Sequence, residues 1–169
     1  EEQYESVGRI AREVQGPVIA AMARATNPKD FEIAWEVLKD SSRPRFHTFV
    51  PASRQYREHF LKKNAEQTRE LAVAAIRTAR QFTADVEFSL VDSFRANPKE
   101  VVELVRAGID AGATTINLAD TVGYATPLDV TQLLQKLRQE VDAFDRVVFS
   151  IHCHNDLGLA LANSLAAAL

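Results

Sequence analysis

The chain has 169 residues, of which 46% are hydrophobic and 25% charged, and its formal net charge is -3 at pH 7. This composition is typical of a globular domain, and without a long run of one charge we expect neither nucleic acid nor an anionic membrane as a partner. No stretch reaches the roughly 20 apolar residues that span a bilayer, and no signal segment opens the chain. The single cysteine, Cys153, excludes an internal disulfide and favours a reducing, cytoplasmic location.

The chain opens inside a helical pattern whose apolar face comprises Tyr4, Val7, Ile10, Ala11 and Val14. It begins with Glu1 rather than Met, and it stops within an alanine-rich stretch that carries no Gly or Pro stop signal. We therefore expect an internal segment of a longer protein.

Three later helices share one start signal, which stands at Asn27-Pro28, Asn97-Pro98 and Thr126-Pro127. The Asn or Thr side chain can accept a backbone N–H of the first turn, and proline at the first helical position loses no hydrogen bond. An acidic residue follows in each first turn, where its negative charge is stabilised by the positive end of the helix dipole. A further helix is predicted from Ala65 to Phe82, and Gly112 is placed to end the helix that starts at Pro98.

Short β-prone runs separate these helices, and none is joined to the next by a hairpin dipeptide. Strands that are connected through helices run parallel, and near-continuous apolar runs suit strands buried on both faces. The sequence therefore predicts a βα array with strands at Pro17–Met22, Arg45–Val50, Asp85–Ser89, Thr114–Leu118 and Arg146–His152.

Two architectures fit such an array: an open doubly wound sheet and part of a closed (β/α)8 barrel. A dinucleotide-binding sheet carries a Gly-rich turn after an early strand, and this chain has only six glycines and no G-x-G-x-x-G motif. Polar residues instead follow several strand ends, as barrel active sites require. Because a whole barrel takes about 250 residues, we expect an α/β fold that is a partial TIM barrel, about strands three to seven with their helices. Residues 1–169 would form one incomplete catalytic domain.

The strongest chemical signal is the segment Ile151–Gly158. His152 and His154 should project to the same side of a strand, with Cys153 on the opposite side. Two imidazoles at the C-terminal end of a strand can bind one divalent cation, and Asn155 or Asp156 can orient a ring or a bound water from behind them. The alternative is a pair of ordinary hydrogen-bonded histidines.

Two histidines alone bind a catalytic ion loosely, so a carboxylate ligand is expected as well. Asp92 and Asp120 are candidates, and their spacing selects neither. Thr121, in the turn that follows Asn117–Asp120, could donate a hydrogen bond to a substrate carboxylate, or it could satisfy local backbone groups. His47 interrupts an apolar strand, where a satisfied core histidine is the alternative to a site residue.

At these residues the chain resembles a family that comprises 2-isopropylmalate, homocitrate and citramalate synthases and hydroxymethylglutaryl-CoA lyase. His152–Gly158 fits the family's H-x-H-[DN]-D-x-G signature, Asn117–Pro127 is similar to its D-T-V-G-Y segment, and Arg45–Phe49 is similar to its R-I-H-T-F strand. The resemblance covers essentially the whole chain, and the first two motifs together are highly specific.

The resemblance implies an acyltransferase that condenses acetyl-CoA with a 2-oxo acid on a divalent metal ion (Mg, Mn or Zn). For the 2-isopropylmalate member, the oxo acid is 2-oxoisovalerate, and the reaction commits carbon to leucine biosynthesis. By position, His152 and His154 would be the metal ligands, and Thr121, His47 and Ser89 would contact the substrate. The resemblance also implies a homodimer.

Much of the family's machinery lies outside this sequence. The L-R-D-G strand, with its metal-binding aspartate and catalytic arginine, would precede Glu1. The G-x-G-E-R-x-G-N segment and the regulatory domain would follow Leu169. We therefore expect the third metal ligand to come from outside the chain, and the chain to be inactive alone.

Some residues depart from the family's pattern. Val91 stands where the F-S-x-E-D segment has glutamate, and Ala52 replaces a frequent threonine. Ala119 is more typical of homocitrate synthases. These differences keep two alternatives open: a homocitrate or citramalate synthase, or a non-catalytic paralogue that serves as a binding or oligomerisation module. A lyase is disfavoured by the close match at Asp120–Tyr124.

Overall fold

The computed structural model describes residues 2–168 and contains one five-stranded parallel sheet. Each strand pairs with the next one along the chain, so the spatial order equals the sequence order. The strands are β1 (Ile19–Met22), β2 (Pro44–Pro51), β3 (Asp85–Val91), β4 (Thr115–Asp120) and β5 (Val148–Cys153). A doubly wound sheet would reverse its order at a switch point. The continuous order is that of a barrel segment, and it confirms the predicted partial barrel.

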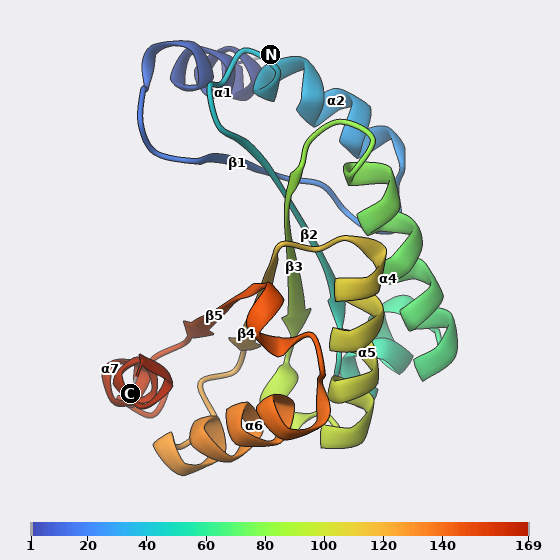
Figure 1. The fold of residues 1–169 in the computed structure, drawn as a ribbon, viewed down its shortest axis with the longest axis vertical. Coiled ribbons are helices and arrows are strands. Elements are labelled where there is room, and N and C mark those ends of the chain that lie inside the picture. The colour runs from blue at the N-terminus through green and yellow to red at the C-terminus, as the bar shows by residue number, and fades with distance from the viewer. Residues whose placement is uncertain (1, 169) are drawn as a thin grey trace.

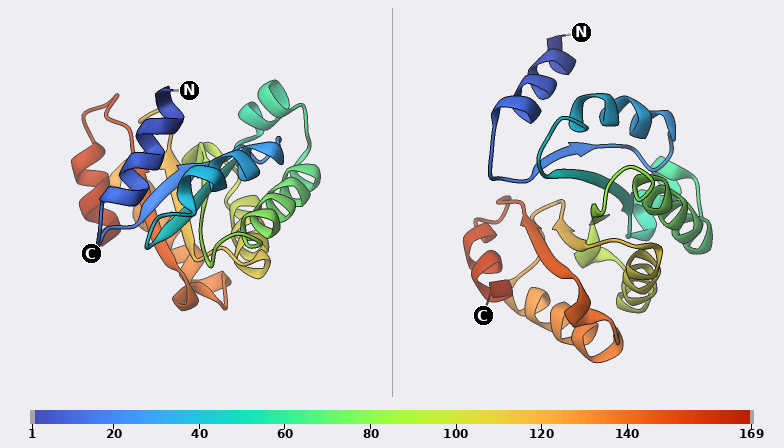
Figure 2. Two further views of the ribbon diagram at one scale, coloured as in Figure 1. Left: turned by 90° about the horizontal axis from the view of Figure 1, so that it is seen from above. Right: turned by 45° about the horizontal axis from the view of Figure 1, so that its top comes forward.

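Helices lie on the outer side of the curved sheet, as Figure 1 and the right view of Figure 2 show. They are α1 (Glu2–Glu13), α2 (Lys29–Leu38), α4 (Ala65–Ala79), α5 (Pro98–Ala111), α6 (Pro127–Glu140) and α7 (Ala160–Ala168). Shorter turns complete the connections: α3 (Arg54–Tyr56), a π-helical turn η1 (Arg57–Leu61), and the 3-10 turns η2 (Ser93–Arg95) and η3 (Phe144–Arg146). Within residues 2–168, every helix falls short of the length or apolarity needed to traverse a bilayer.

Two of the three predicted helix caps form as expected. The Asn97 side chain accepts the Lys99 N–H at 3.0 Å, and Thr126 forms a capping box with Asp129. At the third start the expectation is wrong, because the Asn27 amide donates to the Asp30 carboxylate at 2.6 Å instead of capping α2. Arg24 binds the same carboxylate, so charge pairing there outweighs the cap.

The predicted strands are present, but the bounds of several differ from those expected. Strands β3 and β4 each run two residues past the predicted end, and β5 starts only at Val148 because the preceding residues form η3. Pairing explains the extension: Leu90 lies opposite Leu118, and Asp120 opposite Cys153. A neighbouring strand supplies the hydrogen bonds of these residues, and the sequence of one segment does not show how far that neighbour extends.

Alternate residues of each strand face the helices and form the core. Phe46 and Val50 of β2 are buried there, with Val86, Phe88, Leu90, Ile116 and Leu118 of the next two strands. Two aromatic rings of α2 pack against two others, with the centroids of contacting rings 5.5 to 6.3 Å apart. The four are Phe31 and Trp35 of α2, Phe46 of β2, and Phe82. The other residues of the strands face the inner side of the curve, and this side carries the polar groups described below.

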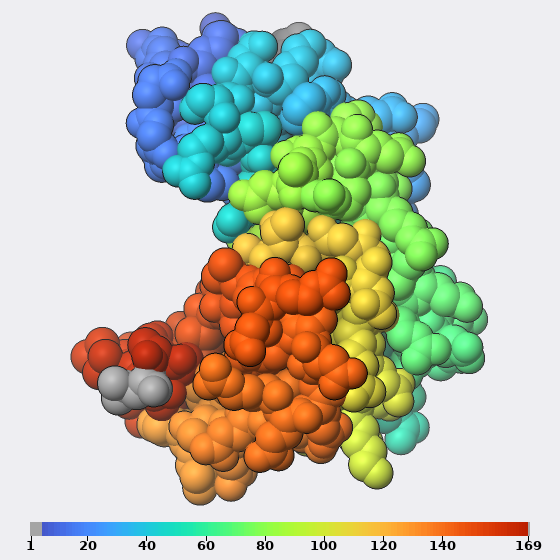
Figure 3. All heavy atoms as spheres, in the orientation of Figure 1, coloured from blue at the N-terminus to red at the C-terminus, as the bar shows by residue number. Residues whose placement is uncertain are grey.

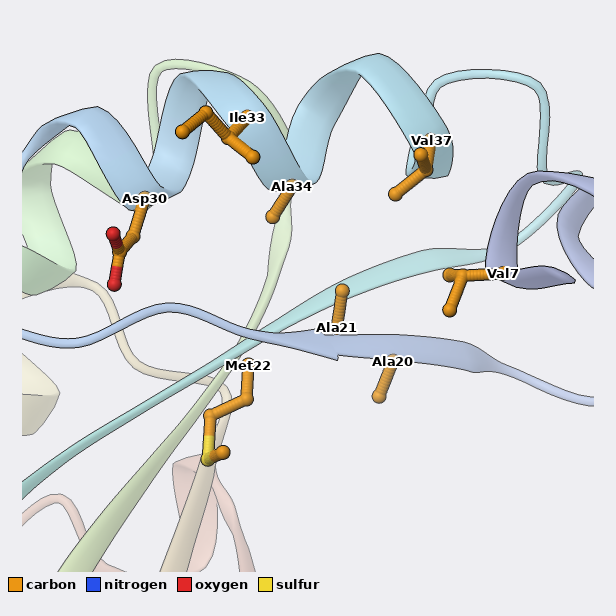
Figure 4. A pocket seen from close by; sticks show the side chains of 8 residues that line it. All are labelled: Val7, Ala20, Ala21, Met22, Asp30, Ile33, Ala34 and Val37. Carbon is orange, nitrogen blue, oxygen red and sulfur yellow. The ribbon is translucent and has the colours of Figure 1, made fainter. Parts of the chain in front are cut away.

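The sheet is open at both edges, and the molecule is hollowed on one side between its N-terminal and C-terminal parts (Figure 3). Next to β1, a groove of about 360 Å³ separates the strand from α1 and α2 (Figure 4); its lining is mostly apolar and comprises Val7, Ala20, Ala21, Met22, Asp30, Ile33, Ala34 and Val37. On the opposite edge, Val148 of β5 is 62% exposed. Apolar side chains and unpaired backbone groups at these edges make self-association of the isolated chain an expected property.

Close packing of α5 against β3 depends on a glycine. A Cβ added at Gly108 would lie 2.8 Å from Cδ1 of the buried Phe88 ring, whereas one added at Gly8 of α1 would meet only Arg12 Nη1, at 3.4 Å, and Val37, at 3.9 Å. We predict that Gly108→Ala lowers the free energy of unfolding by about 1–3 kcal/mol because the ring must shift. Gly8→Ala is the matched control and should raise it by up to about 1 kcal/mol. Urea unfolding followed by circular dichroism measures both changes, and equal stability of the two variants would contradict this account.

Candidate active site

The residues singled out from the sequence gather at one edge of the sheet. Because all five strands are parallel, their C-terminal ends meet there. Asp92 follows β3, Thr121 follows β4, and His152 and His154 lie at the end of β5. His47 and Ser89 lie on the inner face of β2 and β3, four residues before the end of β2 and two residues before the end of β3, respectively.

The two histidines of β5 lie side by side. The ring centroids of His152 and His154 are 4.9 Å apart, and the ring planes are inclined by 23°. Both residues are exposed, and Cys153 between them is directed toward Ser164 of α7. Burial is the main reason that the pKa of the Cys153 thiol is raised, so the thiol stays protonated at neutral pH. The expected separation of the histidines from the cysteine is thus present.

The chemistry of this donor pair suits a divalent cation that accepts imidazole; of the three metals that the resemblance implies, this is Zn²⁺ most of all, since Mg²⁺ and Mn²⁺ prefer oxygen ligands. Within residues 2–168, no third His, Cys, Asp or Glu joins the two histidines in a ligand group. The idea that Asp92 or Asp120 completes the set is therefore wrong. Arg95 and Ser53 hold the Asp92 carboxylate, and backbone N–H groups bind both oxygens of Asp120.

The loop after the histidines is fixed by its own contacts. Asn155 Oδ1 accepts the Ala160 N–H at 3.2 Å and so caps α7. Asp156 packs so closely on Gly123 that a Cβ at that glycine would overlap its carboxylate and its backbone nitrogen. Gly123 also has a φ of 60°, which other residues rarely adopt. That Asn155 or Asp156 orients a histidine ring or a water molecule stays a prediction.

Two hydrogen bonds join this loop and α7 to the turn after β4. The His154 N–H donates to the Asp120 carbonyl at 3.3 Å, and the Asn163 amide donates to the Ala125 carbonyl at 2.8 Å. Asn163 is fully buried. The turn that carries Thr121 and the loop that carries the histidine pair therefore form one interlocked unit. Sequence inspection missed Asn163 because a single polar residue in an apolar helix gives no periodic signal.

A row of polar side chains crosses the inner face of the central strands. His47 Nε2 lies 2.7 Å from Ser89 Oγ, and Asn117 Nδ2 donates to the same oxygen at 2.8 Å. Ser89 Oγ has a second lone pair and its own hydrogen left for His47, so the tautomer of His47 sets which of the two groups donates. His47 and Ser89 are thus in direct contact, whereas their contact with a substrate stays a prediction. Asn117 is an addition that sequence reasoning passed over.

Burial lowers the pKa of His47 below its usual value of 6.5. The neighbouring Glu87 works in the opposite direction, whereas His152 and Arg45 lower the pKa further. His47 is therefore a neutral imidazole at pH 7. A neutral ring carries one N–H donor and one unprotonated nitrogen acceptor, and the contact with Ser89 uses one of the two.

Thr121 has a defined hydrogen-bonding state. Its hydroxyl oxygen accepts the Asp92 N–H at 2.9 Å, so its hydrogen remains available for another acceptor. The side chain is half-buried at the sheet edge. Two of the positions that depart from the family's pattern, Ala52 and Val91, are also neighbours, since the Ala52 N–H donates to the Val91 carbonyl at 2.8 Å.

A family model described as HMGL-like matches residues 1–169, and the chain belongs to the HMGL-like family. It is 50% identical over 163 residues to the 2-isopropylmalate synthase of Carboxydothermus hydrogenoformans, covering 96% of this chain and 32% of that protein. It is 48% identical over 165 residues to the enzyme of the same name from Pyrococcus furiosus, covering 98% and 33%. The chain thus spans about a third of the length of these curated relatives.

Solved structures are similar in fold. Hydroxymethylglutaryl-CoA lyase from Pseudomonas aeruginosa superposes with a TM-score of 0.80 at 25% identity, covering 97% of this chain and 53% of that one. The HMG-CoA lyase from Brucella melitensis gives a TM-score of 0.81 at 18% identity, covering 99% and 58%. The resemblance drawn from the motifs is confirmed at the level of family and fold.

The lowered pKa of His47 has a consequence for stability. Unfolding returns the pKa to its usual 6.5, so the unfolded chain binds the extra proton as the pH falls below that value. We predict that the free energy of unfolding decreases between pH 6.5 and about 5, above the range in which carboxylates titrate. His47→Gln should flatten this part of the profile, and His59→Gln, in the exposed turn η1, should not. Urea unfolding at each pH measures the profile, and equal slopes in wild type and His47→Gln would contradict the prediction.

Proposed function

We propose that this chain is the central catalytic segment of an acyltransferase that condenses acetyl-CoA with 2-oxoisovalerate to give 2-isopropylmalate and CoA, in leucine biosynthesis. The single observation that carries the proposal is the side-by-side pair His152 and His154, facing the same edge as Thr121 and the His47–Ser89–Asn117 row. The 2-isopropylmalate synthase relatives, at up to 50% identity, support it.

In this proposal His152 and His154 hold a divalent metal ion. When bound, such an ion supplies the positive charge that makes a ketone electrophilic and neutralises the developing alkoxide. Thr121 donates its free hydroxyl hydrogen to the carboxylate of the 2-oxo acid. The neutral His47 and the hydroxyl of Ser89 line the inner wall, where fixed dipoles cost no reorganisation during the reaction.

The proposal places the remaining machinery in the longer protein. The third metal ligand and the group that removes a proton from acetyl-CoA belong to its other barrel strands, so the isolated chain is inactive. Those strands would also cover the open edges beside β1 and β5. The whole enzyme acts as a cytoplasmic homodimer on small molecules, with acetyl-CoA as co-substrate.

A second candidate differs only in the oxo acid. Val91 and Ala52, which are hydrogen-bonded neighbours, replace polar residues of the family's pattern on the wall of the same edge. A less polar wall alters which oxo-acid side chain is accepted, so a homocitrate or citramalate synthase is the alternative. CoA release from acetyl-CoA with 2-oxoisovalerate, 2-oxoglutarate or pyruvate, compared as kcat/KM, separates these activities.

The metal assignment is tested with the complete synthase that contains this segment. We expect His152→Ala and His154→Ala each to weaken Mn²⁺ or Zn²⁺ binding by at least about 100-fold. Even the loss of a residue that only hydrogen-bonds to a metal ligand lowers metal affinity about 10- to 100-fold. Titration calorimetry measures the affinity, and thiol-reagent detection of CoA measures turnover.

His59→Ala is the matched control, because this exposed histidine of η1 lies outside the site. It should leave both metal affinity and turnover unchanged. Activity that survives chelation, or that His152→Ala leaves intact, would contradict the assignment of these histidines as metal ligands. Tight binding of a 2-oxo acid without any CoA release would favour the non-catalytic paralogue instead.

A further inference from the structure

The residue Asp92, directly after β3, is held in an unusual way. It is 1% exposed, and its backbone has a φ of 59° and a ψ of 41°. This left-handed conformation is rare for a residue with a side chain and persists only where the surroundings impose it. Lys62 is the other non-glycine residue with positive φ among residues 2–168. Residues held in such conformations are concentrated at functional sites, so the contacts of this buried aspartate indicate what it does.

Its carboxylate joins two loops. The hydroxyl of Ser53, in the turn after β2, donates to Oδ2, and the guanidinium of Arg95 donates to Oδ1 at 2.8 Å and to Oδ2 at 2.7 Å. The Arg95 guanidinium also lies over the Tyr56 ring, 5.9 Å from its centroid. Three donors on two oxygens leave this carboxylate engaged as a fixed support, not as a base or a metal ligand.

Its backbone joins a third loop. The Asp92 N–H donates to Thr121 Oγ1 at 2.9 Å, across the gap between the ends of β3 and β4. A hydroxyl that accepts this bond has a restricted set of directions for its own hydrogen. Because the side-chain bonds of Asp92 fix the peptide that carries the N–H, they also fix the direction of the Thr121 donor.

We propose that Asp92 is a positioning residue that aims the Thr121 hydroxyl hydrogen at the carboxylate of an anionic 2-oxo acid bound at the C-terminal edge of the sheet. The identity of that ligand rests on the proposed function, whereas the coupling of residues 92 and 121 does not. Ser53 and Arg95 act through Asp92. The three turns after β2, β3 and β4 thereby present one preorganised donor.

The experiment is a double-mutant cycle in the complete synthase, with Asp92→Asn, Thr121→Val and the double variant. Asp92→Asn keeps the size of the side chain but exchanges an acceptor for a donor facing Ser53 and Arg95. We expect it to raise the KM for the 2-oxo acid, and its Kd by calorimetry, about tenfold. The KM for acetyl-CoA should change less than about twofold, which a general loss of structure would not reproduce.

In the Thr121→Val background, Asp92→Asn should have no further effect on the KM or Kd of the oxo acid, since the donor that it aims is gone. Ser53→Ala removes one bond to the carboxylate and provides a milder variant should Asp92→Asn fold poorly. Its smaller effect should likewise vanish in the Thr121→Val background. Asp30→Asn is the matched control: Asp30 makes the same kind of pair with Arg24 after β1, but touches no site residue.

Hydrogen exchange measured by mass spectrometry tests the coupling without turnover. Thr121→Val should add one fast-exchanging amide to the peptide that covers residues 88–95. Unchanged exchange there, or effects of Asp92→Asn and Thr121→Val that add in full, would overturn the positioning role. A wild-type enzyme that releases no CoA with any 2-oxo acid would count against the proposed function. The hydrogen-exchange measurement would still test the coupling between Asp92 and Thr121.

Discussion

Parallel pairing of neighbouring strands is the constraint on which the rest of this structure depends. A helix between each pair returns the chain to the same end of the sheet, so every strand terminates at one edge. Residues 92, 121 and 152, which are separated by 29 and 31 positions along the chain, reach the same edge for this reason. The helices on the outer face supply the apolar burial that holds the arrangement, and the inner face is left for polar side chains.

The edge is made rigid by bonds between turns, and these bonds use polar groups that the sheet itself leaves unpaired. Asp92 connects the turns after β2, β3 and β4, and Asn163 and His154 connect the turn after β4 to the segment after β5. Buried polar atoms are costly without partners, so each such bond selects one arrangement of the loops. A site assembled from several strands acquires its precision in this way, although no single loop is long or intrinsically stiff.

The sheet edges and the set of metal ligands are both incomplete in this chain. The apolar groove beside β1 and the exposed face of β5 are surfaces of the kind that further strands of a barrel bury. The histidine pair likewise has two imidazoles where a catalytic cation takes at least three protein ligands. Both observations agree with relatives that are three times as long as the chain.

The sequence by itself determined the order of the elements, the parallel sheet and the family. Proline-marked caps at Asn97 and Thr126, the absence of a Gly-rich turn, and the H-x-H spacing of residues 152 and 154 are local features that need no partner elsewhere. Only the tertiary structure decided which polar groups meet. Asn117 joined the His47–Ser89 pair, and Asp92 and Asp120 proved to be structural acceptors, because register across strands and positive φ at a strand end are set by neighbours far along the chain. The misplaced cap at Asn27 has the same cause, since Arg24 draws Asp30 into a pair that no local pattern encodes.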